Sequence, residues 1–278
     1  MKIKIIADSC CDLSPKLKQL TGTQLVPIKL QIGDSHFIDN EDLDLANYIQ
    51  RMKESPFSPK TACPSPLDFI EHFQGADLIF CVTVSKALSG TYQSAVIAKQ
   101  MYLEEHPDTT IHIFDSKSAS AGETLVVLKI HELIQQGLEF EAIVSKTERF
   151  IEEMETIFLL ESLEHLAKSG RLNPLLAKIA NFFSIKVIAK KSREGTITLD
   201  QKVRGYNKAF QRLIDTIGTY GRYFEEKTLI ISHCNAFDRA QTLQREVEKR
   251  YPFKAIHIVH TGGASSSYAD EGGIIIAF

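Results

Sequence analysis

The sequence predicts an α/β fold, and three features carry this prediction. Short apolar runs rich in β-branched residues recur at strand length along the 278 residues. Most of these runs are separated by amphipathic stretches of helical length, as in folds that alternate strands and helices. One unit, residues 78–114, has the order of a right-handed strand–helix–strand crossover. Hydrophobic residues make up 44% of the chain, enough for one large core or two modest ones.

The expected elements follow from these patterns in chain order. The expected strands are residues 3–7, 25–32, 78–84, 110–114, 156–160, 185–189, 196–199, 228–232, 255–259 and 274–278. The expected helices include residues 42–52, 120–136, 206–220 and 237–251.

The turn after the strand at 78–84 is made of small and polar residues and opens a helix that reaches about His106. The first N–H groups of such a helix are unpaired, and its dipole presents a positive end. Ser89 and Gly90 lie at this start. The turn therefore predicts a site for an anion such as a phosphate or a carboxylate.

Two other strands end in the same dipeptide, Asp8-Ser9 and Asp115-Ser116. Parallel strands of an open α/β sheet bind ligands at their carboxyl ends. We therefore expect these polar ends to gather near the turn at 85–90. Asp and Ser are also common helix N-caps, which is the alternative explanation for each pair.

The second half of the chain has a different pattern. Residues 192–196 have the composition of a hairpin turn between two expected strands. An antiparallel pair suits a mixed α+β domain better than a Rossmann-like parallel layer. We therefore expect two domains, residues 1–155 with the parallel sheet and residues 156–278 with the mixed sheet.

Composition excludes several classes of protein. The net charge of −3 provides no global basic field for nucleic acid. No apolar run approaches the ~20 residues that cross a bilayer. The N-terminus reads as a first strand and not as a signal peptide, so we expect a cytoplasmic protein without stable membrane insertion. Five cysteines without a CxxC pair argue against a disulfide framework.

The familiar enzyme motifs are missing. His257 and His260 lie three apart in an expected strand and so face opposite sides of the sheet, which does not suit one metal ion. The sequence around Ser89 lacks the first glycine of a nucleophile elbow, and no histidine stands out as its base. Neither a P-loop nor the dinucleotide fingerprint is present. We expect no metal, no cofactor and no catalytic centre.

Several motifs taken in order resemble the DegV family of bacterial fatty-acid-binding proteins. They are Asp8-Ser9, TACPSP at 61–66, LSGTYQSA at 88–95, FDSK at 114–117, LEHLAKSGRL at 163–172 and KVR at 202–204. The resemblance covers nearly the whole chain. It implies two α/β domains with a long-chain fatty acid in the cleft between them. It also implies a carrier that presents the acid to a separate fatty acid kinase, for acyl phosphate formation and phospholipid synthesis.

The resemblance also implies how the carboxylate is held. The hydroxyls of Thr61 and Ser89, with N–H groups near Gly90, suit an acid head group. Arg171 is expected beside this group. The alternatives are that Arg171 is a cation at a helix C-terminus and that Thr61 is an ordinary loop residue.

The chain departs from the family near its C-terminus. The family places a His before a Gly-Pro-Gly segment, and counting back from the last strand puts Tyr268 at that position. A second alignment would use His260 but leaves about ten extra residues. A phenol stays neutral near pH 7 where an imidazole can become a cation. Ala62 and Cys63 also replace the family's Ser and Gln.

The remaining expectations concern the tail, the partner and the assembly. Residues 175–183, with Phe158 and Leu160, offer an apolar surface for the tail. Lys202 and Arg204 match the family region implicated in kinase docking, although a solvated charged face is the alternative. We expect a monomer. Two alternatives stay open: an enzyme acting on an acyl or phosphorylated substrate at the Ser89 loop, and a degenerate member that serves only as an interaction module.

Overall fold

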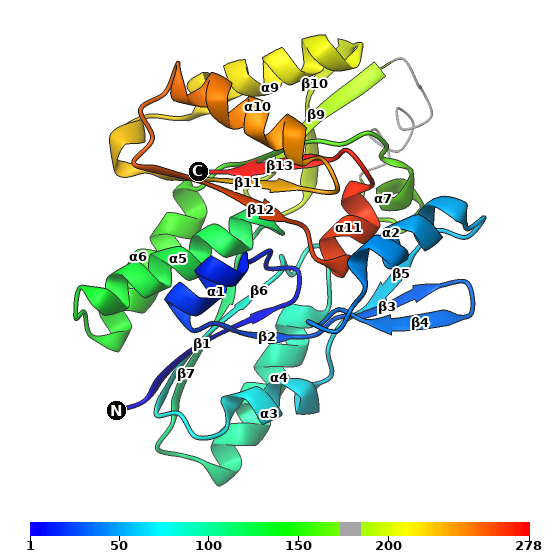
Figure 1. The fold of residues 1–278 in the computed structure, drawn as a ribbon. Coiled ribbons are helices and arrows are strands. Elements are labelled where there is room, and N and C mark those ends of the chain that lie inside the picture. The colour runs from blue at the N-terminus through cyan, green and yellow to red at the C-terminus, as the bar shows by residue number, and fades with distance from the viewer. Residues whose placement is uncertain (173–184) are drawn as a thin grey trace.

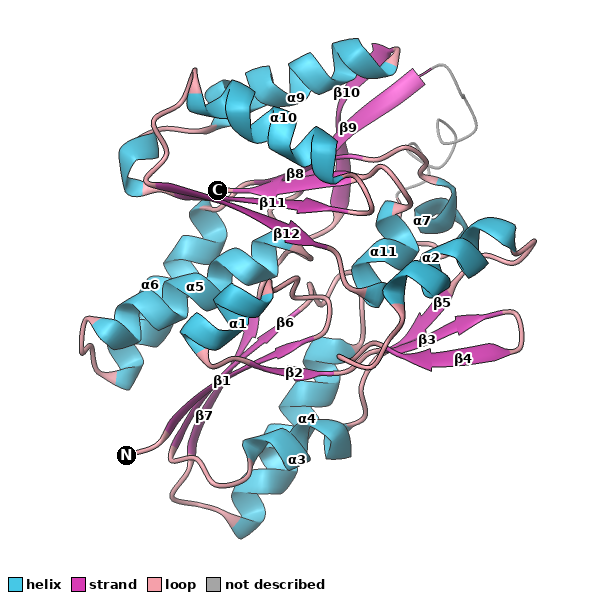
Figure 2. Cartoon of the chain, viewed as in Figure 1, coloured by secondary structure: helices cyan, strands magenta, loops and turns pink. Residues whose placement is uncertain are grey.

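The computed structural model describes residues 1–172 and 185–278. The expected tail-binding residues 175–183 therefore lie outside the described residues. Two large sheets face each other with helices between and outside them (Figures 1 and 2). A small antiparallel sheet lies beside the first of these. The α/β fold class with one parallel and one mixed sheet is confirmed.

The N-terminal sheet is parallel and has the order β2-β1-β6-β7. Its strands are β1 (Ile3–Asp8), β2 (Gln24–Val26), β6 (Leu78–Thr83) and β7 (Thr110–Asp115). Helix α4 (Thr91–Glu105) connects β6 to its parallel neighbour β7, as the predicted crossover requires. Helices α3 (Pro66–Phe73) and α4 cover one face of the sheet, and α1 (Pro15–Thr21), α5 (Ala121–Gln135) and α6 (Phe140–Glu153) lie toward the other (Figure 1).

The expected strand at 25–32 is wrong as a single element. It divides into β2, which pairs with β1, and β3 (Lys29–Ile32), which pairs with β4 (Ser35–Ile38) and β5 (Lys60–Ala62). Pro27 lies at the division and has no N–H to continue the ladder. Ile28 donates its N–H to the Ser9 hydroxyl at 3.0 Å instead, so the chain turns here into a second sheet. Helix α2 (Leu45–Glu54) follows β4.

Helices α1, of 7 residues, and α3, of 8 residues, are among those too short for apolar periodicity to predict. Both carry clear boundary signals, which the sequence contains. Ser14 caps α1, and Ser65 with Asp68 forms a capping box on α3, each followed by a proline in the first turn.

The C-terminal sheet is mixed, with the order β10-β9-β8-β13-β11-β12. The predicted hairpin at 192–196 joins β9 to the antiparallel β10 and is confirmed. Strand β10 continues to Arg204, beyond the expected end at 199. The strands are β8 (Thr156–Leu159), β9 (Ile185–Lys191), β10 (Ile197–Arg204), β11 (Thr228–His233), β12 (Ala255–His260) and β13 (Ile274–Ala277). Helices α9 (Tyr206–Tyr220) and α10 (Phe237–Glu248) cover its outer face (Figure 1).

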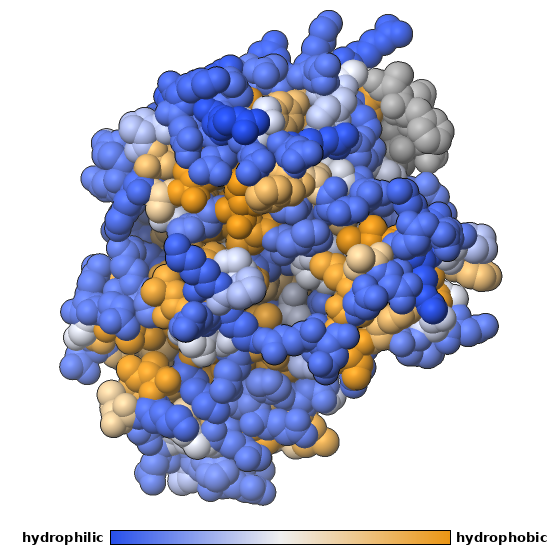
Figure 3. Space-filling view, in the orientation of Figure 1, coloured by the Kyte–Doolittle hydropathy of each residue, from blue (hydrophilic) through white to orange (hydrophobic). Residues whose placement is uncertain are grey.

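Helix α5 lies between the two large sheets and packs on strands of both, so it is buried almost all round. The side chains of β8 alternate about this division: Ile157 and Leu159 pack toward α9, and Phe158 faces the layer shared with α5. On the face in Figure 3, hydrophilic residues cover most of the region of α9 and α10, and hydrophobic residues show in the band below. The proposed division at Thr156 stays a prediction. Among the described residues, no helix is long and apolar enough to cross a membrane.

Candidate functional site

The carboxyl ends of β1, β6 and β7 meet as predicted, and two aspartates hold them together. Asp8 accepts the N–H of Val84 at 2.7 Å and that of Cys10 at 2.9 Å. Asp115 accepts the N–H groups of Lys86 at 3.1 Å and Lys117 at 3.0 Å. Both aspartates therefore fix the loops after the strands and do not act as simple helix N-caps.

A narrow cavity of about 120 Å³ lies between these loops and the inner face of the C-terminal sheet. Its walls are mainly apolar and include the expected tail contacts Phe158 and Leu160. The described residues that line it come from β5 and loops of the N-terminal half, from β8, β13 and the β9–β10 hairpin, from helix α7 (Glu164–Lys168) and the loop after it, and from helix α11 (Gly263–Ala269).

One end of the cavity brings four of the predicted site residues together: Thr61, Ser89, Arg171 and Tyr268. The hydroxyls of Thr61 and Tyr268 are hydrogen-bonded at 2.7 Å. The Arg171 guanidinium lies over the Tyr268 ring, 5.2 Å from its centre, and donates to the Leu88 carbonyl at 3.2 Å. Arg171 therefore fastens the second half of the chain to the Ser89 loop, which a simple helix-terminal cation would not do.

Gly90 is the N-cap residue of α4 and lies behind Ser89. It is not among the described residues that line the cavity. The Ser89 hydroxyl contacts that of Thr91 at 2.8 Å, so it is held at the start of the helix. A Cβ on Gly90 would lie 3.5 Å from the sulfur of Cys63, which shows that Cys63 packs directly against this turn.

Helix α11 places Tyr268, and sequence patterns did not predict this helix. Asp39 accepts the N–H groups of Gly263 at 2.7 Å and Ala264 at 2.8 Å, and Asp12 accepts that of Gly262 at 2.8 Å. A Cβ on Gly263 would lie 2.6 Å from Leu30 and Leu43 atoms. The glycine pair lets the helix approach two aspartates from the distant N-terminal half. A sequence signal was present, because small residues dominate this helix, but its acceptors lie about 220 to 250 residues earlier.

The structure places Tyr268, and not His260, in the cavity. His260 is exposed at the end of β12, with its ring centre 4.8 Å from that of His233. Burial is the main cause that lowers the pKa of His233 to about 4, and His260 adds to it. Neither histidine lines the cavity, and no histidine is among its described lining residues.

Three buried acids, Asp8, Asp12 and Glu123, form a cluster next to the cavity. Desolvation is the main cause that raises the pKa of Asp8 to about 7 and that of Asp12 to about 7, against the opposing effect of their hydrogen bonds. Burial also raises the pKa of Glu123 well above its ordinary value. Neither carboxyl oxygen of Glu123 has a hydrogen-bond partner among the described residues.

Part of the same cluster has the residue types of a metal site. Asp8, Cys10 and Glu123 bring ligand atoms within 4.8 Å of one another. Both Asp8 oxygens, however, already accept backbone N–H groups. Burial also raises the pKa of the Cys10 thiol well above its ordinary value, which opposes the thiolate that a metal requires. The arrangement fits protonated, structural groups better than a metal centre.

Lys202 and Arg204 lie apart from this site on β10, at the edge of the C-terminal sheet. Both side chains are exposed, and residues two apart share one face of a strand. Their position is compatible with partner docking and equally with a solvated face.

Comparison with known proteins identifies the family of this chain. The family described as "Uncharacterised protein, DegV family" matches residues 2–278. The chain belongs to the DegV family. A DegV domain-containing protein of Streptococcus gordonii is 37% identical over 281 residues, covering 100% of this chain and 99% of that protein.

Solved DegV structures share the fold and contain fatty acids. The family protein from Ruminococcus gnavus, refined with vaccenic acid, has a TM-score of 0.94 at 38% identity and covers 99% of both chains. The Streptococcus pneumoniae Fatty Acid Kinase (Fak) B3 protein loaded with linoleic acid has a TM-score of 0.92 at 36% identity, covering 100% of this chain and 99% of that one. A Eubacterium eligens protein loaded with heptadecanoic acid has a TM-score of 0.91 at 30% identity, covering 99% and 98%. These relatives support the expectation of a ligand-binding carrier and not of an enzyme.

Proposed function

We propose that this DegV protein binds one long-chain fatty acid in the cavity between its two halves and presents the carboxylate to a fatty acid kinase. One observation carries the proposal: a mainly apolar cavity ends in two hydroxyls, a phenol and a guanidinium. The protein itself then needs no catalytic group. The fatty acids held by the R. gnavus and S. pneumoniae relatives support this choice of ligand.

The acyl tail supplies most of the binding free energy. Each buried methylene contributes ~0.8 kcal/mol, so a long chain gains on the order of 10 kcal/mol before the cost of association is subtracted. The carboxylate adds less, because removing it from water is costly unless donors replace the lost water. The head-group contacts therefore serve mainly to orient the acid.

The end with Thr61, Arg171 and Tyr268 supplies donors for such an acid. The Thr61 and Tyr268 hydroxyls bond each other, so either can turn its proton toward a carboxylate oxygen. Arg171 lies beside them and supplies a positive charge that Tyr268 cannot. Ser89 completes the set from the opposite loop.

A route from the head-group end to the outside supports presentation of the carboxylate to a kinase. Thr61, Arg171 and Tyr268 also line a second groove on the outer side, together with residues 56–60 and Lys168. A carboxylate held by these residues would therefore lie next to a basic groove. The Fak B3 relative is the comparison that favours a kinase partner.

Native mass spectrometry of the purified protein, followed by lipid extraction, tests the ligand. We expect one fatty acid per chain, released on denaturation. Protein that stays empty after incubation with oleate would contradict the proposal. The variant Ser89→Ala distinguishes a carrier from an enzyme. If the wild-type protein turns over an acyl or phosphorylated substrate and this variant does not, catalysis at the Ser89 loop is favoured.

The partner is tested with a bacterial fatty acid kinase, ATP and oleate. We expect the double variant Lys202→Glu and Arg204→Glu to bind oleate normally but to slow acyl phosphate formation by reducing kinase affinity about tenfold or more, because like-charge contacts at an interface cost several kcal/mol. The control is Lys249→Glu, an exposed lysine at the end of α10. Equal rates for both variants would contradict docking at β10.

A further inference from the structure

The cavity has a second end, which the head-group residues do not reach. Thr156, Phe158 and Leu160 alternate along β8 and all line the cavity, so this strand runs along its length. Leu160 lies toward the head-group end, since a Cβ on Gly273 would contact both it and Ala269, the neighbour of Tyr268. Thr156 therefore marks the far end.

A pair of hydroxyls closes this far end tightly. Thr156 is hydrogen-bonded to Ser118 at 2.7 Å, and both side chains are buried. A Cβ on Gly122 would lie 2.0 Å from the Ser118 oxygen and 2.9 Å from that of Thr156, so helix α5 packs directly behind them. Among the described residues, this packing leaves no room for an acyl chain to extend past the Ser118–Thr156 pair.

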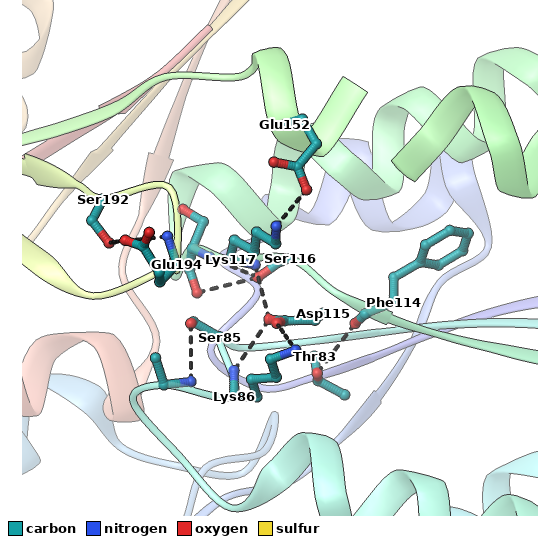
Figure 4. A network of polar contacts seen from close by, with 12 residues as sticks. Thr83, Ser85, Lys86, Phe114, Asp115, Ser116, Lys117, Glu152, Ser192 and Glu194 are labelled. Atoms are coloured by element: carbon teal, nitrogen blue, oxygen red, sulfur yellow. Dashed lines mark hydrogen bonds and ion pairs between the residues drawn. The ribbon is translucent and has the colours of Figure 1, made fainter. Parts of the chain in front are cut away.

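The β9–β10 hairpin forms the neighbouring part of this end. Gly195 at its tip has φ +82°, and a Cβ there would lie 2.2 Å from the Ser85 oxygen and 2.9 Å from Lys117 Cα. The tip of the hairpin thus rests on the loops after β6 and β7. Figure 4 shows Ser192 and Glu194 of the hairpin beside Lys117, with Ser85 and Lys86 next to them.

Two lysines supply the remaining wall through their aliphatic stems. Lys117 and Lys191 both line the cavity, but their ammonium groups bind the last turn of α6, outside it. Lys117 pairs with Glu152, as Figure 4 shows, and Lys191 donates to the Ile151 carbonyl at 2.9 Å. Burial is the main cause that lowers the pKa of Lys191. With their charges held at α6, the stems present hydrocarbon to the cavity.

Backbone hydrogen bonds within each half of the chain hold the two sides of this end in place. Ser192 donates its N–H to the Thr196 carbonyl at 2.7 Å, which holds the hairpin closed. Ser85 donates its N–H to the Ser118 carbonyl at 2.8 Å, which fixes the loop beneath it. Interiors so tightly packed do not stretch to admit further atoms without a cost.

We propose that this wall, formed by Gly195, the stems of Lys117 and Lys191, and the Ser118–Thr156 pair, sets the acyl chain length that the protein accepts. The inference rests on the proposed fatty acid binding and deepens it. A chain that reaches the wall fills the cavity. A longer chain must either displace the hairpin or leave its carboxylate short of Thr61 and Tyr268.

The test uses two variants that open the wall by different means. Lys191→Ala removes a stem, with Lys191→Met as the control that keeps it. Gly195→Ala pushes the hairpin from Ser85, with Gly205→Ala as its control. Gly205 has a similar φ of +84° but nothing within 4 Å of a Cβ, so it reproduces the backbone strain without the contact.

Delipidated protein is incubated with equal amounts of myristate, palmitate, stearate and arachidate, and native mass spectrometry measures the acids bound. We expect Lys191→Ala and Gly195→Ala to shift binding toward the longer acids by about fourfold or more, the effect of burying one further methylene. Both controls should retain the wild-type profile.

An unchanged profile in Lys191→Ala and Gly195→Ala, with one acid still bound per chain, would overturn the length inference alone. Failure of the wild-type protein to bind any of the four acids would overturn the proposed function, and the inference with it. If Gly195→Ala does not fold, the Lys191 pair decides by the same comparison.

Discussion

Tyr268 connects three groups at the head-group end of the cavity. Its hydroxyl bonds Thr61, its ring receives the Arg171 guanidinium, and its helix is held by Asp39. A phenol at this position supplies a hydrogen-bond donor but, unlike an imidazole, no titrating cation near pH 7. Of the four predicted residues at this end, Arg171 is therefore the one that supplies a positive charge for a carboxylate.

The substitution Tyr268→Phe removes this donor and leaves the ring. We expect oleate affinity to fall by about thirtyfold, since a hydrogen bond to a charged group contributes ~2 kcal/mol. Fluorescence or calorimetric titration measures it, with Tyr223→Phe as a control at an exposed tyrosine. Unchanged affinity would remove Tyr268 from the site.

Glu123 is the buried acid whose protonation has the clearest consequence. Its pKa is raised by burial, so the folded chain keeps a proton that the unfolded chain releases above about pH 4. This contribution to stability is complete at low pH and is lost as the pH rises toward the raised folded pKa.

We expect Glu123→Gln to weaken the loss of stability as the pH rises from about 4 toward the raised folded pKa of Glu123, because the amide cannot ionise. Urea denaturation across this range measures it. Glu104→Gln, at an exposed position, is the control. Parallel curves for wild type and Glu123→Gln would show that the carboxyl is not protonated in the folded protein. Asp8 and Asp12 leave a residual slope in the variant.

At the scale of elements, α11 shows how a short helix is placed by distant side chains. It has 7 residues, and small residues make up most of it. Asp39 and Asp12 accept its first N–H groups, and the Tyr48 hydroxyl of α2 bonds Ser267 at 2.6 Å. The helix therefore depends on the N-terminal half for its position, and Tyr268 depends on the helix.

We expect Asp39→Ala to destabilise the protein by ~3 kcal/mol and to weaken oleate binding as well. The change leaves two backbone N–H groups and the Ser9 hydroxyl without their acceptor. Chemical denaturation and titration measure the two effects, with the exposed Asp42→Ala as control. A stability loss without any effect on binding would show that α11 keeps Tyr268 in place without Asp39.

At the scale of the molecule, α5 and the cavity occupy the layer between two sheets. One hydrophobic cluster extends from Ile5 of the first sheet to Ala277 of the second, through α5. The two halves therefore share a core, and the cavity lies within this shared layer. A ligand that fills the cavity contacts both halves at once.

Binding should accordingly stabilise the whole fold. At about 100 times its Kd, a ligand adds ~2.7 kcal/mol, which corresponds to a Tm increase of about 5 °C for a chain of this size. We expect oleate to produce this shift in a thermal melt and oleyl alcohol, which lacks the carboxylate, to produce a smaller one. Equal shifts would show that Thr61, Ser89, Arg171 and Tyr268 do not recognise the acid.

The alternation of strands and helices, the β9–β10 hairpin and the polar ends of β1, β6 and β7 could all be predicted from the sequence. These features are local: they depend on periodicity, turn composition and residues a few positions apart. Ordered motifs also indicated the family, which the whole-chain match confirms. The break at Pro27 is not local in this sense, because one continuous apolar run enters two different sheets.

Which residues share the cavity depends on the packing of the elements and could not be predicted from local patterns in the sequence. Thr61 and Tyr268 are 207 positions apart, and Arg171 donates to a carbonyl 83 positions away. Gly195 and Ser85 meet because both sheets present their loops to one layer. Such contacts depend on packing between elements, which no local pattern encodes. The chemistry of each residue was readable from the chain, but its neighbours were set by the fold.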